Sequence, residues 1–280
     1  MRTTLSGTGK TVTIGPGLPT VIIGERINPT GKKRLAAALA AGDLDLICEM
    51  AKAQVAAGAD VLDINVGIAG GDEVTLLPRA VQAVAEVADV PLCLDTANPR
   101  ALEAALRVVP GRPLVNSVNG EEKSLSAVLP LVKEFGAAVI GLTMDERGIP
   151  KDAATRLEFA ARIVERAEAL GISRNDVMID CLVLPVGAEP QSGCVALETV
   201  RLVRERLGVN VNLGVSNVSF GLPDRPVINQ AFVTAAIVAG MTCVIADPAG
   251  LCAAVRAADL LLGRDEFAER YIAHYRATRK

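Results

Sequence analysis

Residues 57–66, Ala-Gly-Ala-Asp-Val-Leu-Asp-Ile-Asn-Val, contain the pattern that decides the fold. A segment of helical periodicity, Leu44–Ala57, runs into Gly58, and glycine is the residue that helices favour just past their C-terminus. A short aliphatic run follows, with Asp63 and Asn65 near its end. A helix, a capping glycine and a short apolar strand form the repeating unit of parallel α/β folds.

The same unit recurs along the chain. Phe135-Gly136-Ala137 and Ala239-Gly240-Met241 again place a glycine between a helical segment and an aliphatic run. Eight short runs are nearly continuous in hydrophobicity, as expected of parallel strands that are covered on both faces. These runs are Val21–Gly24, Val61–Val66, Pro91–Asp95, Pro113–Val118, Ala138–Thr143, Val177–Leu182, Val211–Val215 and Cys243–Asp247.

Segments with helical periodicity fill the intervals between these runs. Eight alternations of strand and helix predict an α/β fold of the (β/α)8 TIM-barrel type. An open doubly wound sheet is the alternative, but it needs a glycine fingerprint after an early strand, and none is present. The expected helices are Leu44–Ala57, Glu73–Ala88, Arg100–Val109, Lys123–Phe135, Ala153–Leu170, Glu198–Leu207, Val227–Ala239 and Cys252–Leu262.

Three parts of the chain follow from this pattern. Residues 20–263 form the expected barrel. Residues 1–19 form an N-terminal extension rich in Gly and Thr, which we expect to be a hairpin over the amino-terminal end of the barrel. Residues 264–280 have a charged amphipathic pattern and predict a C-terminal helix packed outside the barrel.

The composition excludes several classes of function. The net charge is −3 with 22% charged residues, so there is no basic surface for nucleic acid. The six cysteines form no CxxC pair and there is a single histidine, which predicts buried, reduced thiols and no bound metal. Neither an N-terminal apolar segment nor an apolar run of about 18 residues occurs, so we expect a cytoplasmic protein without a membrane span.

Polar residues close nearly every expected strand. In a (β/α)8 barrel the chemistry lies at the carboxyl ends of the strands. The residues there are rich in Asp and Asn and include no cluster of His, Lys or Cys. They are Glu25, Arg26 and Asn28, then Asp63 and Asn65, Asp95, Asn116 and Asn119, Thr143 and Asp145, Asp180, Ser216 and Asn217, and Asp247.

Three kinds of ligand suit this polar ring to different degrees. Carboxylates suit Mg²⁺, but without His they make a poor transition-metal site. Paired carboxylates also serve glycoside hydrolysis, yet a chain with five Phe, two Tyr and no Trp offers little aromatic surface for a sugar. A flat heterocycle with several N–H donors fits best, because carboxylates accept hydrogen bonds from adjacent N–H and NH₂ groups.

Each polar residue also has a purely structural interpretation. Asp63 and Asp95 suit helix N-caps, and Asn116 and Asn217 suit turns. Glu25 and Arg26 suit a surface ion pair that contributes little to the stability of the fold. It is their occurrence together at one end of the barrel that favours a binding site.

Motifs along the barrel carry a resemblance to a known family. In these motifs the chain resembles the pterin-binding methyltransferases. This family comprises the methyltetrahydrofolate:corrinoid methyltransferases and the folate module of cobalamin-dependent methionine synthase. The resemblance spans Thr20 to Leu262 in order. The motifs are Val21-Ile-Ile-Gly-Glu25-Arg26-Ile27-Asn28-Pro-Thr-Gly31, Asp63-Ile-Asn65-Val-Gly67, Leu92-Cys-Leu-Asp95, Val115-Asn116-Ser117-Val-Asn119, Ile140-Gly-Leu-Thr-Met144, Gly148-Ile-Pro-Lys151-Asp152, Ile179-Asp180, Leu213-Gly-Val-Ser216-Asn217-Val-Ser219 and Arg225-Pro-Val-Ile-Asn229.

The resemblance implies roles for individual residues. Asp180 would accept hydrogen bonds from the ring N–H and exocyclic amine of the pterin. Asp95 and Asn116 would hold its opposite edge. Asn217 would stand beside the nitrogen that bears the methyl group, which makes Asn217 and Asp95 the candidate catalytic residues. The remaining implied pterin-site residues are Asp63 as support, Glu25 and Arg225.

The resemblance also implies the reaction, a reversible SN2-type transfer of a methyl group between methyltetrahydrofolate and the cobalt of a corrinoid. The chain lacks an Asp-x-His-x-x-Gly cobalamin motif, so the cobalamin would arrive on a partner corrinoid protein or free. It also lacks zinc ligands for homocysteine, which excludes a complete methionine synthase. A homodimer is a family-level expectation.

Two alternatives remain open. One is a pterin enzyme of the dihydropteroate synthase type, which would carry an Asn-x-Thr-x-Asp-Ser-Phe-like loop and a late Ser-x-Arg-x-His-like anion site. Here Glu25-Arg26-Ile27-Asn28 and Ala246-Asp247-Pro248-Ala249 stand at those places. The other is a folate-binding subunit without catalytic activity. An assay with methyltetrahydrofolate and reduced cobalamin separates these from a methyltransferase.

Overall fold

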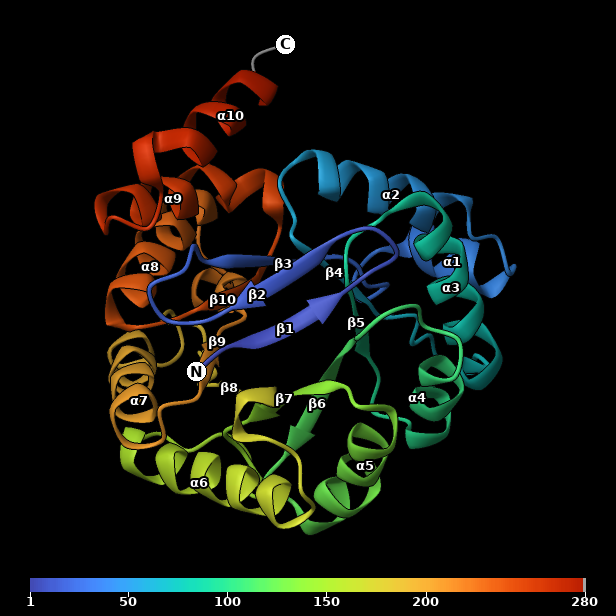
Figure 1. The fold of residues 1–280 in the computed structure, drawn as a ribbon, viewed down its shortest axis with the longest axis horizontal. Helices are drawn as coiled ribbons and strands as arrows, with labels where there is room; N and C mark the ends of the chain where they lie inside the picture. The colour runs from blue at the N-terminus through green and yellow to red at the C-terminus, as the bar shows by residue number, and fades with distance from the viewer. Residues whose placement is uncertain (279–280) are drawn as a thin grey trace.

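Eight parallel strands form one sheet in the order β10-β3-β4-β5-β6-β7-β8-β9. The structure, a computed structural model, describes residues 1–278. Gly214, just after β9, forms a parallel bridge with Ile245 of β10, so the sheet closes into a (β/α)8 barrel surrounded by helices, as predicted (Figure 1). The strands are β3 Val21–Ile27, β4 Val61–Ile64, β5 Leu92–Asp95, β6 Leu114–Asn119, β7 Ala138–Leu142, β8 Val177–Asp180, β9 Asn210–Asn212 and β10 Cys243–Ala246.

The helices of the barrel lie where the periodicity predicts, with two differences. The sequence did not predict α1, an Ala-rich helix that buries only Leu35 and Leu39. The helix expected from Glu198 begins instead at Ser192, whose buried hydroxyl accepts a hydrogen bond from the Leu184 N–H at 2.7 Å. The helices are α1 Lys33–Ala40, α2 Asp45–Ala56, α3 Glu73–Val87, α4 Pro99–Leu106, α5 Glu122–Phe135, α6 Ala153–Ala169, α7 Ser192–Arg206, α8 Arg225–Ala239 and α9 Pro248–Leu261.

The seventh barrel strand is shorter than predicted. The expected run Val211–Val215 becomes β9, Asn210–Asn212, followed by the 3-10 helix η2, Val215–Ser219. Val215 and Val218 are buried under this turn. The chain leaves the sheet early because these two side chains pack into the core from η2 rather than from a strand. Asn217 therefore lies on a helical turn and not at a strand end.

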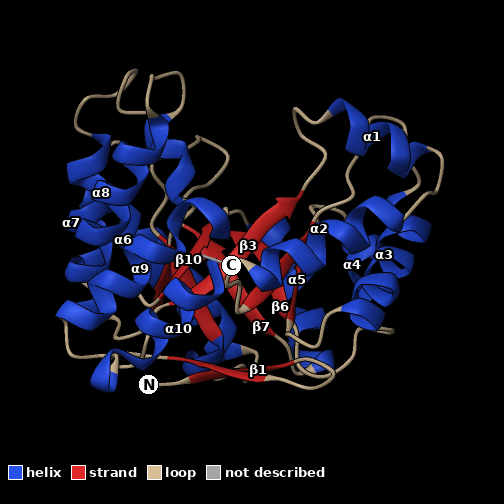
Figure 2. Cartoon of the chain, turned by 90° about the horizontal axis from the view of Figure 1, so that it is seen from above, coloured by secondary structure: helices blue, strands red, loops and turns tan. Residues whose placement is uncertain are grey.

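The amino-terminal end of the barrel is covered by a hairpin. β1 Thr3–Ser6 and β2 Thr11–Ile14 pair antiparallel and cross below the barrel strands (Figure 2). Leu5 and Ile14 are fully buried and join the apolar cluster inside the barrel. Asn210 of β9 ties the hairpin down, since its Nδ2 donates to Thr3 Oγ1 at 2.9 Å and to the Ile14 carbonyl at 3.1 Å.

The core is divided into two layers by the two-residue period of the strands. The larger cluster lies between the outer face of the barrel and the helices. The smaller one fills the inside of the barrel at its amino-terminal half. Its strand residues are Val21, Ile23, Val61, Cys93, Leu114, Ala138, Ile140, Met178 and Cys243.

The C-terminal segment packs on the outside of the barrel. A 3-10 turn, η3 Glu266–Ala268, leads into α10, Glu269–Thr278, which projects past α9 in Figure 1. The helix expected over 264–280 also included residues 279 and 280, which lie outside the described residues. Of the six thiols, four are buried, Cys48 is partly buried and Cys194 is exposed, so the expectation of buried cysteines was wrong for Cys194.

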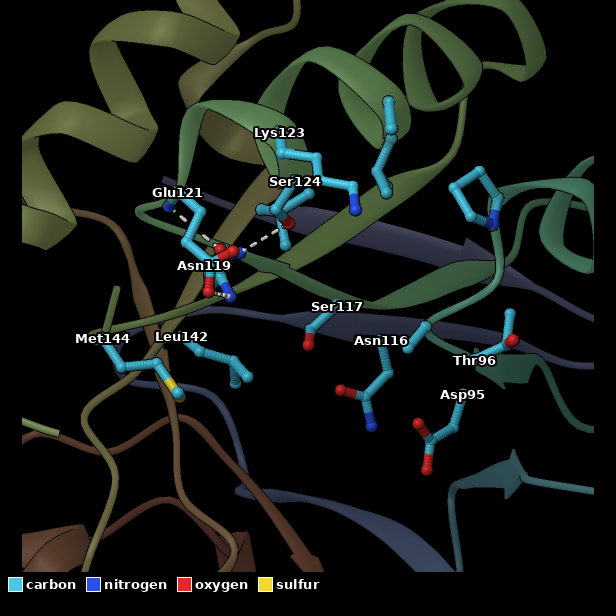
Figure 3. A pocket seen from close by; sticks show the side chains of 15 residues that line it. Asp95, Thr96, Asn116, Ser117, Asn119, Glu121, Lys123, Ser124, Leu142 and Met144 are labelled. Atoms are coloured by element: carbon cyan, nitrogen blue, oxygen red, sulfur yellow. Dashed lines mark hydrogen bonds between the residues drawn. The ribbon is translucent and has the colours of Figure 1, made fainter. Parts of the chain in front are cut away.

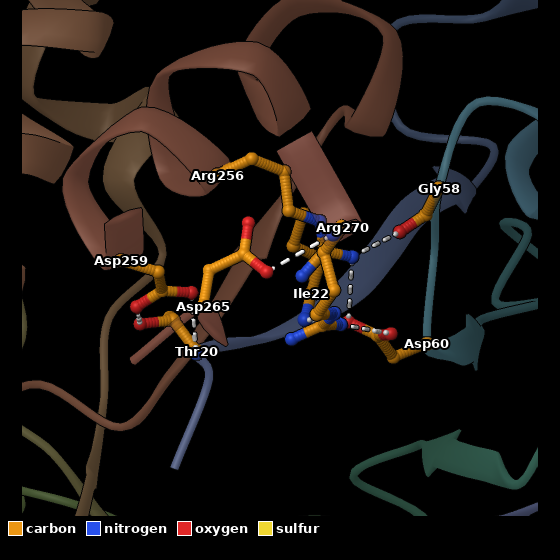
Figure 4. Close-up of polar contacts among 8 residues, drawn as sticks. All are labelled: Thr20, Ile22, Gly58, Asp60, Arg256, Asp259, Asp265 and Arg270. Atoms are coloured by element: carbon orange, nitrogen blue, oxygen red, sulfur yellow. Dashed lines mark hydrogen bonds and ion pairs between the residues drawn. The ribbon is translucent and has the colours of Figure 1, made fainter. Parts of the chain in front are cut away.

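Asp60 joins this C-terminal segment to the barrel (Figure 4). Its carboxylate lies 3.5 Å from Arg256 Nη2 of α9 and 3.2 Å from Arg270 Nη2 of α10. It also accepts a hydrogen bond from the Ile22 N–H of β3 at 2.9 Å. Because one carboxylate contacts three elements, α9 and α10 are held against the start of the barrel sheet.

Asp259 forms a second such junction in Figure 4. Its side chain is 1% exposed and accepts from the N–H and the hydroxyl of Thr20, at 2.7 and 2.8 Å. Thr20 is the residue at which the chain passes from the hairpin into β3. This buried carboxylate thus holds the connection between the hairpin and the barrel.

We expect Asp259→Asn to lower the free energy of unfolding by about 2 to 4 kcal/mol, because an amide loses the charge-assisted acceptor and leaves a buried donor of Thr20 unsatisfied. Chemical denaturation measures the loss. Glu198→Gln, the same kind of change at an exposed position of α7, is the control and should shift stability by less than about 0.5 kcal/mol. Equal effects of the two substitutions would contradict the assigned role of Asp259.

Candidate active site

The polar ring faces the inside of the barrel because side chains alternate along each strand. Cys93 belongs to the interior cluster, and Asp95 lies two residues further on the same strand. The sheet register pairs Asp95 with Asn116 and Asp180 with both Leu142 and Asn212. The interior positions at the carboxyl end are Glu25 on β3, Asp63 on β4, Asp95 on β5, Asn116 on β6, Leu142 on β7, Asp180 on β8, Asn212 on β9 and Ile245 on β10.

Asp63, Asp95 and Asn116 form one hydrogen-bonded cluster. Asn116 Nδ2 donates to Asp63 Oδ1 at 3.1 Å, and Asn65 Nδ2 donates to Asp95 Oδ2 at 3.0 Å. Burial raises the pKa of Asp63, which is 3% exposed, and the neighbouring Asp95 carboxylate raises it further. Burial also raises the pKa of Asp95, which accepts a hydrogen bond from Asp63. Burial of the pair therefore favours the protonated form of Asp63, the more deeply buried of the two, which donates to Asp95.

Asp180 is the second buried carboxylate of the rim. Asn212 Nδ2 donates to Asp180 Oδ2 at 2.6 Å, and the Leu182 N–H donates to Oδ1 at 2.8 Å. Burial raises the pKa of Asp180 to about 6, against the opposing effect of these bonds and one from the Gly214 N–H. The prediction from sequence missed Asn212. The alternation Asn210-Val211-Asn212, which places both amides on the inner face, was the available signal.

Gly214 forms hydrogen bonds with both Asp180 and Asn217 and so places these two residues close together. The Gly214 N–H donates to Asp180, and the Gly214 carbonyl accepts from the Asn217 N–H at 3.4 Å. A Cβ placed on Gly214 would lie 3.4 Å from Asn217 Nδ2, so the amide group stands directly over this glycine. Asn217 is exposed, so its amide is accessible from the open end of the barrel.

Glu25 and Arg225 lie on the other side of the rim. Ser216 Oγ donates to Glu25 Oε1 at 3.0 Å. Arg225 Nη2 donates to the Ser216 carbonyl at 2.8 Å, and its Nε donates to Ser219 Oγ at 3.0 Å. Burial raises the pKa of Glu25. Arg225, the first residue of α8, thus anchors the 3-10 turn that bears Asn217.

Two cavities open at this end of the barrel. The larger, of about 490 Å³, lies on the β5–β7 side and is lined by Asp95, Asn116 and Leu142 (Figure 3). The smaller, of about 300 Å³, is lined by Glu25, Ser216 and Arg225 among others. The structure thus brings Asp63, Asp95 and Asn116 into one cluster. Asp180 on β8 and Asn217 on η2 lie beside each other but line neither cavity, and Glu25 and Arg225 line only the smaller one. The residues of the two cavities share no member.

The donor set of this rim suits an organic ligand. Within residues 1–278 no group of three or more His, Cys, Asp or Glu side chains is arranged to hold a metal ion. The carboxylates of Asp63, Asp95 and Asp180 are paired with side-chain amides instead of cations. Such carboxylates retain lone pairs for N–H donors of a planar heterocycle.

Comparisons with known proteins agree with a heterocycle-binding barrel. Residues 24–247 match the family model described as pterin binding enzyme. The chain is 32% identical over 264 residues to a methylcorrinoid:tetrahydrofolate methyltransferase of Eubacterium limosum, covering 91% of this chain and 96% of the relative. It is 33% identical over 225 residues to methionine synthase of Mycobacterium tuberculosis, covering 76% of this chain but only 19% of that longer protein.

Solved structures with the same fold include dihydropteroate synthases. The enzyme from Yersinia pestis superposes with a TM-score of 0.71 at 19% identity, covering 94% of this chain and 99% of that one. The enzyme from Clostridium difficile superposes with a TM-score of 0.68 at 23% identity, covering 88% and 98%. At these identities the likeness shows the fold. Together with the family match, it establishes that the chain belongs to the pterin-binding enzymes.

The pKa of Asp180 predicts a pH dependence of stability. A carboxyl whose folded-state pKa of about 6 exceeds its unfolded value stabilises the fold fully below about pH 4 and loses this contribution as the pH rises to about 6. We expect the wild type to lose about 3 kcal/mol across this window relative to Asp180→Asn, which has no titrating carboxyl there. Denaturation at several pH values measures the difference. Parallel curves for the two proteins would contradict the assignment.

Proposed function

We propose that this protein moves a methyl group between methyltetrahydrofolate and the cobalt of a corrinoid carried by a partner protein. Membership of the pterin-binding enzymes and 32% identity to a methylcorrinoid:tetrahydrofolate methyltransferase support the proposal. The observation that contributes most is the pairing of Asp95 and Asp180 with amides at the open end of the barrel, next to Asn217. A homodimer, which the resemblance implies, and a cytoplasmic location, which the sequence pattern predicts, complete the proposal.

In this proposal the pterin lies flat across the barrel mouth between two sets of acceptors. The Asp180 carboxylate accepts from the adjacent ring N–H and exocyclic amine, which is a charge-assisted bidentate arrangement. Asp95 and Asn116 bind the opposite edge, and Asp63 below them holds Asn116 in place through its hydrogen bond. Ionised Asp180 is needed for this pairing, so folate affinity should fall below about pH 6.

The chemical difficulty lies in the leaving group. A methyl group on a tertiary amine is a poor electrophile because the departing nitrogen gains negative charge, whereas a reduced corrinoid is a strong nucleophile. A donor that binds this nitrogen more tightly as charge develops stabilises the transition state selectively. The Asn217 amide, held over Gly214 by the 3-10 turn that Arg225 anchors, is the proposed donor.

A direct assay tests the reaction. We expect the purified chain to convert methyltetrahydrofolate, cob(I)alamin and one proton from solvent into tetrahydrofolate and methylcobalamin, and the change in the corrinoid absorption spectrum follows the reaction. Formation of dihydropteroate from a pterin diphosphate and p-aminobenzoate should not occur. Folate binding without methyl transfer would instead favour a subunit without catalytic activity and would contradict the proposal.

Asn217→Ala should lower the rate of methyl transfer by roughly 30- to 900-fold, since removal of an oxyanion-hole type donor costs on the order of 2 to 4 kcal/mol in the transition state. Because Asn217 is exposed, the free energy of unfolding should change by less than about 0.5 kcal/mol. Asn175→Ala is the control, since this exposed amide lies at the opposite end of the barrel, just before β8. A wild-type rate in the Asn217 variant would remove the proposed role.

No helix within residues 1–278 is long and apolar enough to cross a membrane.

The partner that delivers the corrinoid is expected at the carboxyl end of the barrel, because the open mouth and Asn217 face that side.

A further inference from the structure

The larger cavity extends well beyond the residues proposed to bind the pterin. From Asp95 and Asn116 it runs outward over β6 to the first turn of α5, where Lys123 and Ser124 line it (Figure 3). Its volume of about 490 Å³ lies in the range of sites for whole small molecules, roughly 300 to 1,000 Å³. Leu142, among others, provides an apolar wall between the two ends.

Lys123 is the one cationic side chain that lines this cavity among the residues that the structure describes. It takes part in none of the hydrogen bonds or ion pairs found within residues 1–278. Other lysines of the chain are engaged, such as Lys10 with Asp89 at 3.2 Å and Lys151 with Glu189 at 2.6 Å. An unpaired cation at the outer end of a ligand cavity is available for an anionic group.

We propose that Lys123 binds the carboxylates of the folate's glutamate tail, and that the protein thereby favours polyglutamylated over monoglutamylated folate. This inference rests on the proposed function, because it requires a folate in the cavity. It assigns a specificity-determining residue to the part of the substrate that does not react.

The chemistry of the substrate fits the kinds of residue that line the cavity. A folate has a bicyclic head rich in N–H donors, then an aromatic aminobenzoyl group, and then a glutamate with two free carboxylates. The cavity offers acceptors at Asp95 and Asn116, apolar surface at Leu142 and Met144, and the ammonium of Lys123. Each additional γ-linked glutamate adds one carboxylate at the end where Lys123 lies. The first turn of α5 also favours anions through the helix dipole.

Glu121, the one acidic residue that lines this outer end of the cavity, is occupied elsewhere. Asn119 Nδ2 donates to Glu121 Oε1 at 3.1 Å, and the Glu121 N–H donates to Asn119 Oδ1 at 2.9 Å. Figure 3 shows the carboxylate of Glu121 turned toward Asn119. Glu121 therefore does not form an ion pair with Lys123, although its charge weakens the attraction for a carboxylate nearby.

The test compares the binding of tetrahydrofolate with one and with three glutamates, measured by calorimetry at low and high salt. The wild type should bind the triglutamate more tightly. Lys123→Ala should weaken triglutamate binding by about two- to fivefold, as expected of an exposed ion pair, and Lys123→Glu by more. Both effects should shrink at high salt because screening weakens exposed charges. Glu121→Gln should strengthen triglutamate binding.

Lys10→Glu is the matched control, since it makes the same charge change on the hairpin at the other end of the barrel. Equal ratios of triglutamate to monoglutamate affinity in Lys123→Glu and Lys10→Glu would overturn the inference, and so would failure to bind either folate. Methyl transfer is measured separately with the monoglutamate and free cob(I)alamin. Its absence, with the tail preference lost only in the Lys123 variants, would refute the proposed reaction while supporting the role of Lys123.

Discussion

The two-residue alternation of side chains along each barrel strand is the constraint on which the rest of the structure depends. Within β4 and β5 the inner face changes from Val61 to Asp63 and from Cys93 to Asp95 in a single step. Closure of the sheet brings these positions together around the barrel axis. The inside of the barrel is therefore apolar in its amino-terminal half, and it carries a polar cup, formed by Asp63, Asp95 and the polar side chains at the same level of the other strands, at its carboxyl end. A shift of one residue in any strand would exchange inside for outside and would remove both levels together.

Burial of carboxylates in such a cup is costly unless each one has hydrogen-bond partners. The chain meets this demand with amides from neighbouring strands, as Asn116 bonds Asp63 and Asn212 bonds Asp180. An amide satisfies a carboxylate without neutralising it, so burial still raises the pKa of Asp180 to about 6. The same deficit of positive charge makes the cup receptive to a ligand that brings its own N–H donors.

The barrel could be predicted from the sequence because eight apolar runs and their glycine caps are local signals. Asp63, Asp95, Asn116 and Asp180 could be found for the same reason, since each lies on a strand whose position is clear, at or before its carboxyl end. The position of Asn217 could not, because η2 exists only through the packing of side chains from distant elements. The separation of Glu25 from the larger cavity is likewise a matter of three-dimensional spacing around the rim, which strand order alone does not give.

The two ends of the barrel use acidic residues in opposite ways. At the amino-terminal end, the Asp60 carboxylate forms ion pairs with Arg256 and Arg270. These ion pairs hold α9 and α10 against the barrel. At the carboxyl end, no Lys or Arg lies within ion-pair distance of Asp95 or Asp180 among the described residues. A cation there would neutralise the carboxylates and occupy the lone pairs that a pterin needs. Asp95 and Asp180 without an ion-pair partner thus remain free for binding, whereas Asp60 with its two arginines contributes to stability, although both ends use the same acidic side chain.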